Sequence, residues 1–262
     1  MTTRGAPPPD DPVIPEYTDD PAVVPSTWNQ RLTALVEVVV CSGFPTQILL
    51  IGTLALLGMT AIDPSGTLSL SYIFVLSMAD TVLLLCLIFY FLRRSQEHPA
   101  DVFLGARSPR HELRLGLILT PLVLGVALGG MSLIYYLWPG LRDVPENPFE
   151  ALLRSPWNAA VFAVVGVVAG GIREELQRAF VLWRFERHLG GGTVGLVVFS
   201  LAFGLGHVIQ GWDAAVVTAL LGALWGGVYL VRRSVVSTVV SHAGFNLVEI
   251  FLAHAGVSAG AG

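Results

Sequence analysis

Long apolar runs dominate the pattern along the chain. Several of them approach or exceed the 18 residues that typify a membrane-crossing helix. We therefore predict an all-α fold, a polytopic membrane helix bundle with about seven transmembrane helices. Their approximate ranges are 32–59, 68–92, 115–138, 157–183, 193–210, 213–231 and 235–254.

The composition supports a membrane protein. The chain of 262 residues is 53% hydrophobic and 13% charged, whereas soluble domains carry about 25% charged residues. Its two cysteines, Cys41 and Cys86, lie inside apolar runs. We interpret them as small buried hydrophobic residues rather than a disulfide or a zinc site.

The chain divides into three predicted regions. Residues 1–28 are rich in proline and acidic residues, lack the pattern of a signal peptide, and are expected to form a disordered cytoplasmic tail. Residues 29–156 hold the N-terminal membrane helices and loops, and residues 157–254 hold the helix core that carries the candidate chemistry. Glu37 and Pro45 interrupt the first run, so part of it is expected to be interfacial.

Arginine placement predicts the topology. With seven spans, the loop 93–114, the segment after the fourth span and the segment after the sixth span fall on one side, together with the N-terminal tail. Their arginines are Arg93, Arg94, Arg107, Arg110, Arg114, Arg184, Arg187, Arg232 and Arg233, against Arg142 and Arg154 on the other side. The positive-inside rule then places the N-terminus in the cytoplasm. We expect a multi-pass protein in the plasma membrane of a bacterium.

Two short matches to known motifs carry little weight. "HELRL" at 111–115 begins like the zincin motif, but Leu115 stands where the second histidine ligand belongs. "GGGTVG" at 190–195 lies between two membrane helices and not after a strand, so we interpret it as a flexible turn.

Charge returns abruptly at the end of the fourth run. Glu174 and Arg178 are four residues apart and share a helix face, so we expect them to pair, whereas Glu175 is turned about 100° away. A charge at depth costs roughly 2.5–3.5 kcal/mol on insertion scales. The alternative interpretation is that the span has ended and that the pair is a cytoplasmic cap.

Polar residues on two later runs favour a functional site. His207 ends the fifth run, while His242 and Asn246 lie four apart on one face of the last run. A glutamate here can act as general base toward water, with imidazole and amide donors holding the oxyanion. Alternatively, Glu174, His207 and His242 can bind Zn²⁺ with an open position for water.

These residues resemble the signature of the CPBP (CAAX-protease and bacteriocin-processing) intramembrane proteases. The three parts are Glu174-Glu175 with Arg178, Phe203 with His207, and His242 with Asn246. The resemblance covers about residues 157–250. It implies that Glu174 is the general base, that His207 helps to hold the water, and that His242 and Asn246 stabilise the oxyanion. Glu175 and Arg178 would shape the site, and the enzyme would be either glutamate-type or metal-dependent.

One spacing departs from the family pattern. The common form is Glu-Glu-x-x-x-Arg, and this chain has Glu-Glu-x-x-Arg. An alignment on the arginine would put Arg173 in the first glutamate position. We prefer the alignment on the glutamates, because Arg173 cannot serve as a base.

The predicted function is hydrolysis of a peptide bond in a membrane-associated protein or peptide near the cytoplasmic leaflet. The expected partners are this membrane-tethered substrate and the lipid bilayer, and no nucleic acid. One alternative is a non-catalytic scaffold or immunity factor with the same fold. Another is a small transporter in which Asp80 and Glu37 line a pathway with Glu174.

Overall fold

The computed structural model describes residues 26–144 and 147–260, with only the backbone of 257–260. Residues 1–25, most of the predicted tail, lie outside the described residues. Helices are the regular elements of the described chain: α1 Trp28–Val40, α2 Phe44–Leu56, α3 Leu70–Arg94, α4 Pro99–Phe103, α5 Pro109–Leu137, η1 Pro139–Leu141, η2 Glu150–Arg154, α6 Pro156–Val165, η3 Gly166–Arg173, α7 Glu174–His188, α8 Gly192–Leu205, η4 Val208–Gln210, α9 Trp212–Arg232 and α10 Val236–Gly260.

The all-α membrane bundle is confirmed, but seven crossings are not. Every predicted run is helical, and four helices of the described chain are long and apolar enough to cross a membrane: α3, α5, α9 and α10. The pair α1 and α2, bent by 41°, makes a fifth when counted as one span. Helix α8 has only 14 residues, and the run through α6, η3 and α7 ends in charged turns.

The first predicted run breaks for a local reason. Gly43 has a φ of 89° and Pro45 follows at the start of α2, so the helix cannot continue through this point. Glu37 faces the protein interior, where it is only 3% exposed and is bound to Arg184 on α7; the interfacial placement of part of this run stays a prediction. The predicted tail also ends earlier, since Thr27 caps α1 through a reciprocal pair with Gln30.

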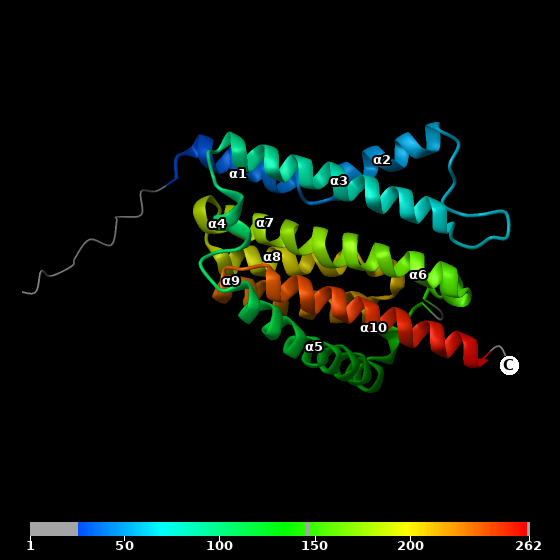
Figure 1. Cartoon of the computed structure of the whole chain (residues 1–262). Helices are drawn as coiled ribbons and strands as arrows, with labels where there is room; N and C mark the ends of the chain where they lie inside the picture. The colour runs from blue at the N-terminus through cyan, green and yellow to red at the C-terminus, as the bar shows by residue number, and fades with distance from the viewer. Residues whose placement is uncertain (1–25, 145–146, 261–262) are drawn as a thin grey trace, which may run out of the picture.

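One end of the bundle gathers the arginines that the topology argument placed on one side. Arg232 binds Glu112, Arg233 binds Glu186, and Arg107 donates to the carbonyl of Arg232. The N-terminal end of α1 lies at the same end, because Ser26 donates to the carbonyl of Arg187. The C-terminus lies at the other end (Figure 1). The shared side of these segments is thus observed, whereas the cytoplasmic orientation stays a prediction.

Helix α7 lies in the centre of the bundle, between α3 and the helices α8 and α9 (Figure 1). Its residues 177–182 are all buried, polar and apolar alike. Its core neighbours come from α3, α4, α8 and α9. A helix buried on all sides holds its side chains in fixed places, which is what a site needs.

Candidate active site

The helix that carries the two glutamates changes its winding just before them. Residues Gly166–Arg173 form a π-helix inside the continuous run from α6 to α7. Such segments are rare and frequently occur at functional sites. Its glycines face α10, where a Cβ on Gly170 would lie 2.4 Å from Asn246 Nδ2 and one on Gly171 would lie 2.8 Å from the Ala243 Cβ. The two helices therefore approach each other closely at this point.

Glu175 lies in a buried cluster with a cation and an imidazole. It is 1% exposed, it binds Arg178 one turn along α7, and its Oε1 is 2.8 Å from His242 Nδ1. Arg178 is equally buried, with its guanidinium 4.7 Å from the centre of the Phe203 ring. The expected pairing of Arg178 with Glu174 is therefore wrong. Residues at i and i+3 are also neighbours on a helix, and this spacing brings Glu175 to Arg178.

His242 is held in one orientation from two sides. Its ring stacks on Trp225 at 3.9 Å between centres and an interplanar angle of 17°. A carboxylate can only accept, so His242 Nδ1 donates to Glu175 and Nε2 is left to face the other way. His242 Nε2 lies 3.9 Å from Glu174 Oε2. This gap is too long for a direct hydrogen bond and suits a shared water.

His207 reaches the same region because α8 is short. At 1.5 Å per residue, the 14 residues of α8 extend about 21 Å, less than the roughly 30 Å hydrocarbon core. His207 Nδ1 is 2.8 Å from the Phe203 carbonyl, which only accepts, so Nε2 of the neutral ring is a free acceptor. The Phe203 ring contacts both imidazoles, with centres 4.9 Å from His207 and 6.2 Å from His242.

Asn246 lies one turn after His242. Its Nδ2 donates to the carbonyl of Gly166 in the π-helix at 2.8 Å. An amide nitrogen carries two hydrogens, so one donor remains for another partner.

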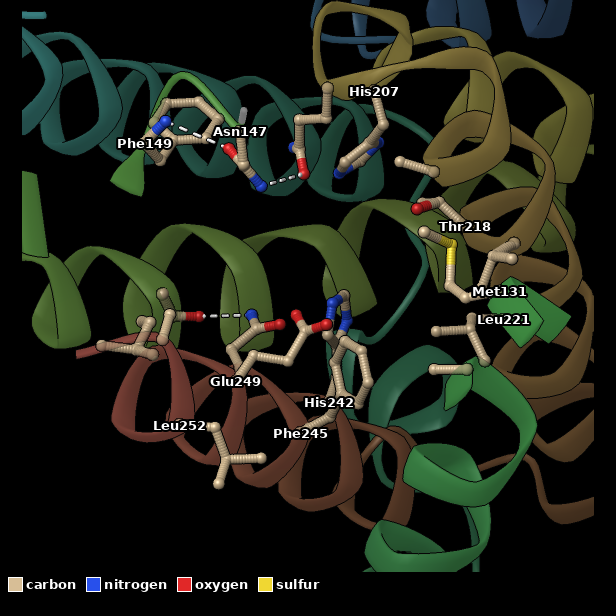
Figure 2. A pocket seen from close by; sticks show the side chains of 18 of the residues that line it. Met131, Asn147, Phe149, His207, Thr218, Leu221, His242, Phe245, Glu249 and Leu252 are labelled. Atoms are coloured by element: carbon tan, nitrogen blue, oxygen red, sulfur yellow. Dashed lines mark hydrogen bonds between the residues drawn. The ribbon is translucent and has the colours of Figure 1, made fainter. Parts of the chain in front are cut away.

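Two cavities meet at these side chains. The larger has a volume of about 510 Å³ and is lined by His207, His242 and Asn246, among others. Figure 2 shows His242 and Phe245 projecting from α10, with His207 on the opposite side of the view. The smaller, of about 310 Å³, is lined by Glu174 and again by His207. All six predicted residues therefore lie in one region, with Glu174, His207, His242 and Asn246 lining the space and Glu175 and Arg178 buried behind it.

Comparison with known proteins agrees with this geometry. Residues 156–248 match the family described as "Rce1-like: Type II CAAX prenyl endopeptidase Rce1-like". This match covers about a third of the chain and supports the resemblance of its helix core to the CPBP family. No curated protein and no solved structure gives a significant match. At the general level, the match supports a protease, and the long apolar helices support an integral membrane protein.

The alternative hypothesis for the site is zinc binding by Glu174, His207 and His242. Among the described residues, no group of three or more His, Cys, Asp and Glu side chains is arranged to hold a metal ion. Glu174 and His242 are neighbours, but His207 does not complete a ligand set with them. The zinc hypothesis stays a prediction, and the reaction proposed below uses no metal.

The site also involves Trp225 and Arg173, which the sequence did not assign to it. Trp225, seventeen residues before His242, gave no signal because its role is a contact between helices. Arg173, considered only for the alignment, binds Asp80 of α3, and Asp80 accepts from Thr46 at 2.5 Å. Asp80 and Glu37 are thus both bound to arginines, Arg173 at the end of η3 and Arg184 on α7, as structural acids would be.

Proposed function

We propose that the protein is a glutamate-type intramembrane endopeptidase that hydrolyses a peptide bond of a membrane-tethered protein or peptide. One observation carries the proposal. Glu174 Oε2 and His242 Nε2 are 3.9 Å apart; Glu174 lines the smaller cavity, His242 lines the larger, and His207 lines both. A water between them would contact a base and lie beside the donors that hold an oxyanion.

In the proposed reaction, Glu174 takes one proton from this water, while Nε2 of His207 accepts a hydrogen bond from the O–H that the water keeps. The water oxygen bonds to the scissile carbonyl carbon, and the carbonyl oxygen becomes an oxyanion. Glu174 then returns the proton to the leaving nitrogen as the C–N bond breaks. No residue changes its net protonation over the cycle.

The oxyanion would be stabilised by His242 and Asn246. For Nε2 of His242 to donate, the imidazole must carry a hydrogen on both nitrogens, because Nδ1 donates to the Glu175 carboxylate. Asn246 Nδ2 donates one hydrogen to the carbonyl of Gly166, and its second hydrogen would bind the oxyanion. Glu175 and Arg178 act through His242 and are positioning residues.

The larger cavity also suits a peptide. Its volume of about 510 Å³ lies within the range of ligand pockets, roughly 300–1,000 Å³, and its lining is mostly apolar. The family resemblance suggests three kinds of substrate: prenylated C-termini, leader peptides and other membrane-tethered peptides.

The test compares Glu174→Gln with wild type on a panel of lipidated peptides that carry a fluorophore and a quencher, in liposomes. The proposal predicts a loss of cleavage of about 10²-fold to 10⁴-fold, the usual contribution of a general base. Glu186→Gln is the matched control, because Glu186 lies on the same helix and binds only Arg233 at the bundle end. A cleavage rate of Glu174→Gln equal to that of wild type would refute the mechanism. A panel that wild type leaves intact would favour the scaffold alternative.

A further inference from the structure

The larger cavity extends along α10 beyond the residues of the family signature. Its charged lining is acidic, since the described residues around it include Glu249 and Glu150 and neither arginine nor lysine. Asn147, Gln210 and Thr218 are neutral polar groups of the lining, and its two histidines, His207 and His242, lie at the proposed active site. A cavity with this lining favours a cationic guest over an anionic one.

Glu249 is the carboxylate closest in sequence to the proposed oxyanion site. It follows Asn246 by three residues and His242 by seven, so all three lie on one face of α10. All three line the cavity, and Figure 2 shows Glu249 projecting from the same helix as His242 and Phe245. Glu249 therefore extends the proposed active site along the helix axis.

The contacts of Glu249 among the described residues show no structural role for its carboxylate. Among the described residues it makes no hydrogen bond or ion pair, whereas Glu37, Asp80 and Glu175 are each bound to an arginine. It also lies within a segment long and apolar enough to cross the membrane, Val236–Gly256. Glu249 is exposed, so its carboxylate is accessible to a guest in the cavity, and an acidic residue within such a segment usually marks a functional site.

We propose that Glu249 binds a basic side chain of the substrate peptide and so determines specificity. The proposal rests on the proposed function for the nature of the guest, a peptide. Seven helical residues separate Glu249 from His242 by about 10 Å along the axis. An extended peptide covers that distance in about three residues. The preferred lysine or arginine thus lies about three residues from the cleaved bond.

The test measures binding, so it does not depend on cleavage. The full-length protein is placed in nanodiscs of phosphatidylcholine, a lipid without net charge. Lysine or norleucine is scanned through a neutral, palmitoylated peptide, and the Kd is measured by fluorescence anisotropy. We expect one position where lysine binds about tenfold more tightly than norleucine, the value of one charge-assisted hydrogen bond.

Three variants assign that preference. Glu249→Gln should bring the lysine-to-norleucine ratio to about one, Glu249→Lys should reverse it so that norleucine binds more tightly than lysine, and Glu186→Gln should leave it unchanged. A wild-type protein without a lysine preference at any position, or a preference that survives in Glu249→Gln, would overturn the proposal. If the preference follows Glu249 but no peptide is cleaved, the binding site stands and the proteolytic function fails.

Discussion

The two adjacent glutamates should differ in how much stability the protein loses when each is replaced by glutamine. Glu175→Gln removes the negative charge that compensates Arg178, and both side chains are 1% exposed. Arg178 already has two buried nitrogens, Nε and one terminal NH₂, without a partner. Breaking a buried ion pair in this way typically costs about 3–5 kcal/mol. For a chain of this size, that corresponds to a fall in Tm on the order of 10 °C.

Glu174→Gln should cost far less stability. Glu174 is 18% exposed, and its nearest charged atoms, on Arg173 and His242, are each 3.9 Å away. We expect a change of about 1 kcal/mol or less, as for a weakly paired group near water. Both variants should lose cleavage, one because the base is gone and the other because His242 loses its orientation.

The assay is thermal unfolding of each purified variant in the same lipid nanodiscs, followed by intrinsic fluorescence. The double variant Glu175→Leu/Arg178→Met serves as a control, because an apolar pair removes the buried charge altogether. It should recover most of the lost Tm and stay inactive. Equal falls in Tm for Glu174→Gln and Glu175→Gln, or an unchanged Tm for Glu175→Gln, would contradict the stabilising role of the buried Glu175–Arg178 pair.

Two further predictions concern the π-helix and the metal question. Gly170→Ala should lower cleavage at least tenfold, because the new Cβ would lie 2.4 Å from Asn246 Nδ2. The control is Gly227→Ala, because the space around its Cβ position is open. Equal activity of the two variants would contradict the role of Asn246. Activity should survive dialysis against EDTA, because the proposed reaction uses Glu174 rather than a metal ion to activate the water. Activity lost to EDTA and restored by Zn²⁺ would assign a metal-dependent enzyme instead.

The sequence could predict the site's members because helical spacing is local. His242 and Asn246 share a face by their separation alone, and the order of the three motifs matched a known signature. Bringing them together required helix packing, which depends on the glycine face of residues 166–171 and on the shortness of α8. Neither the π-helix nor the stacking of Trp225 on His242 has a local pattern that would predict it.

Charge partners were harder to predict than positions. Both i+3 and i+4 neighbours can pair on a helix, so the spacing alone did not decide between Glu175 and Glu174 as the partner of Arg178. From the sequence, Asp80 and Glu37 suggested an ion pathway, because their arginine partners could not be identified. These partners lie 93 and 147 residues away in the chain. Only tertiary contacts reveal that these acids anchor α1 and α3 to the central helix.

The most direct measurement is the ratio of initial cleavage rates of wild type and Glu174→Gln on one lipidated peptide in liposomes, with both proteins shown to have the same Tm. The account predicts a ratio of at least about 10², with Glu186→Gln close to wild type. A ratio near one, at a rate clearly above that of protein-free liposomes, would contradict the central claim that Glu174 activates the water.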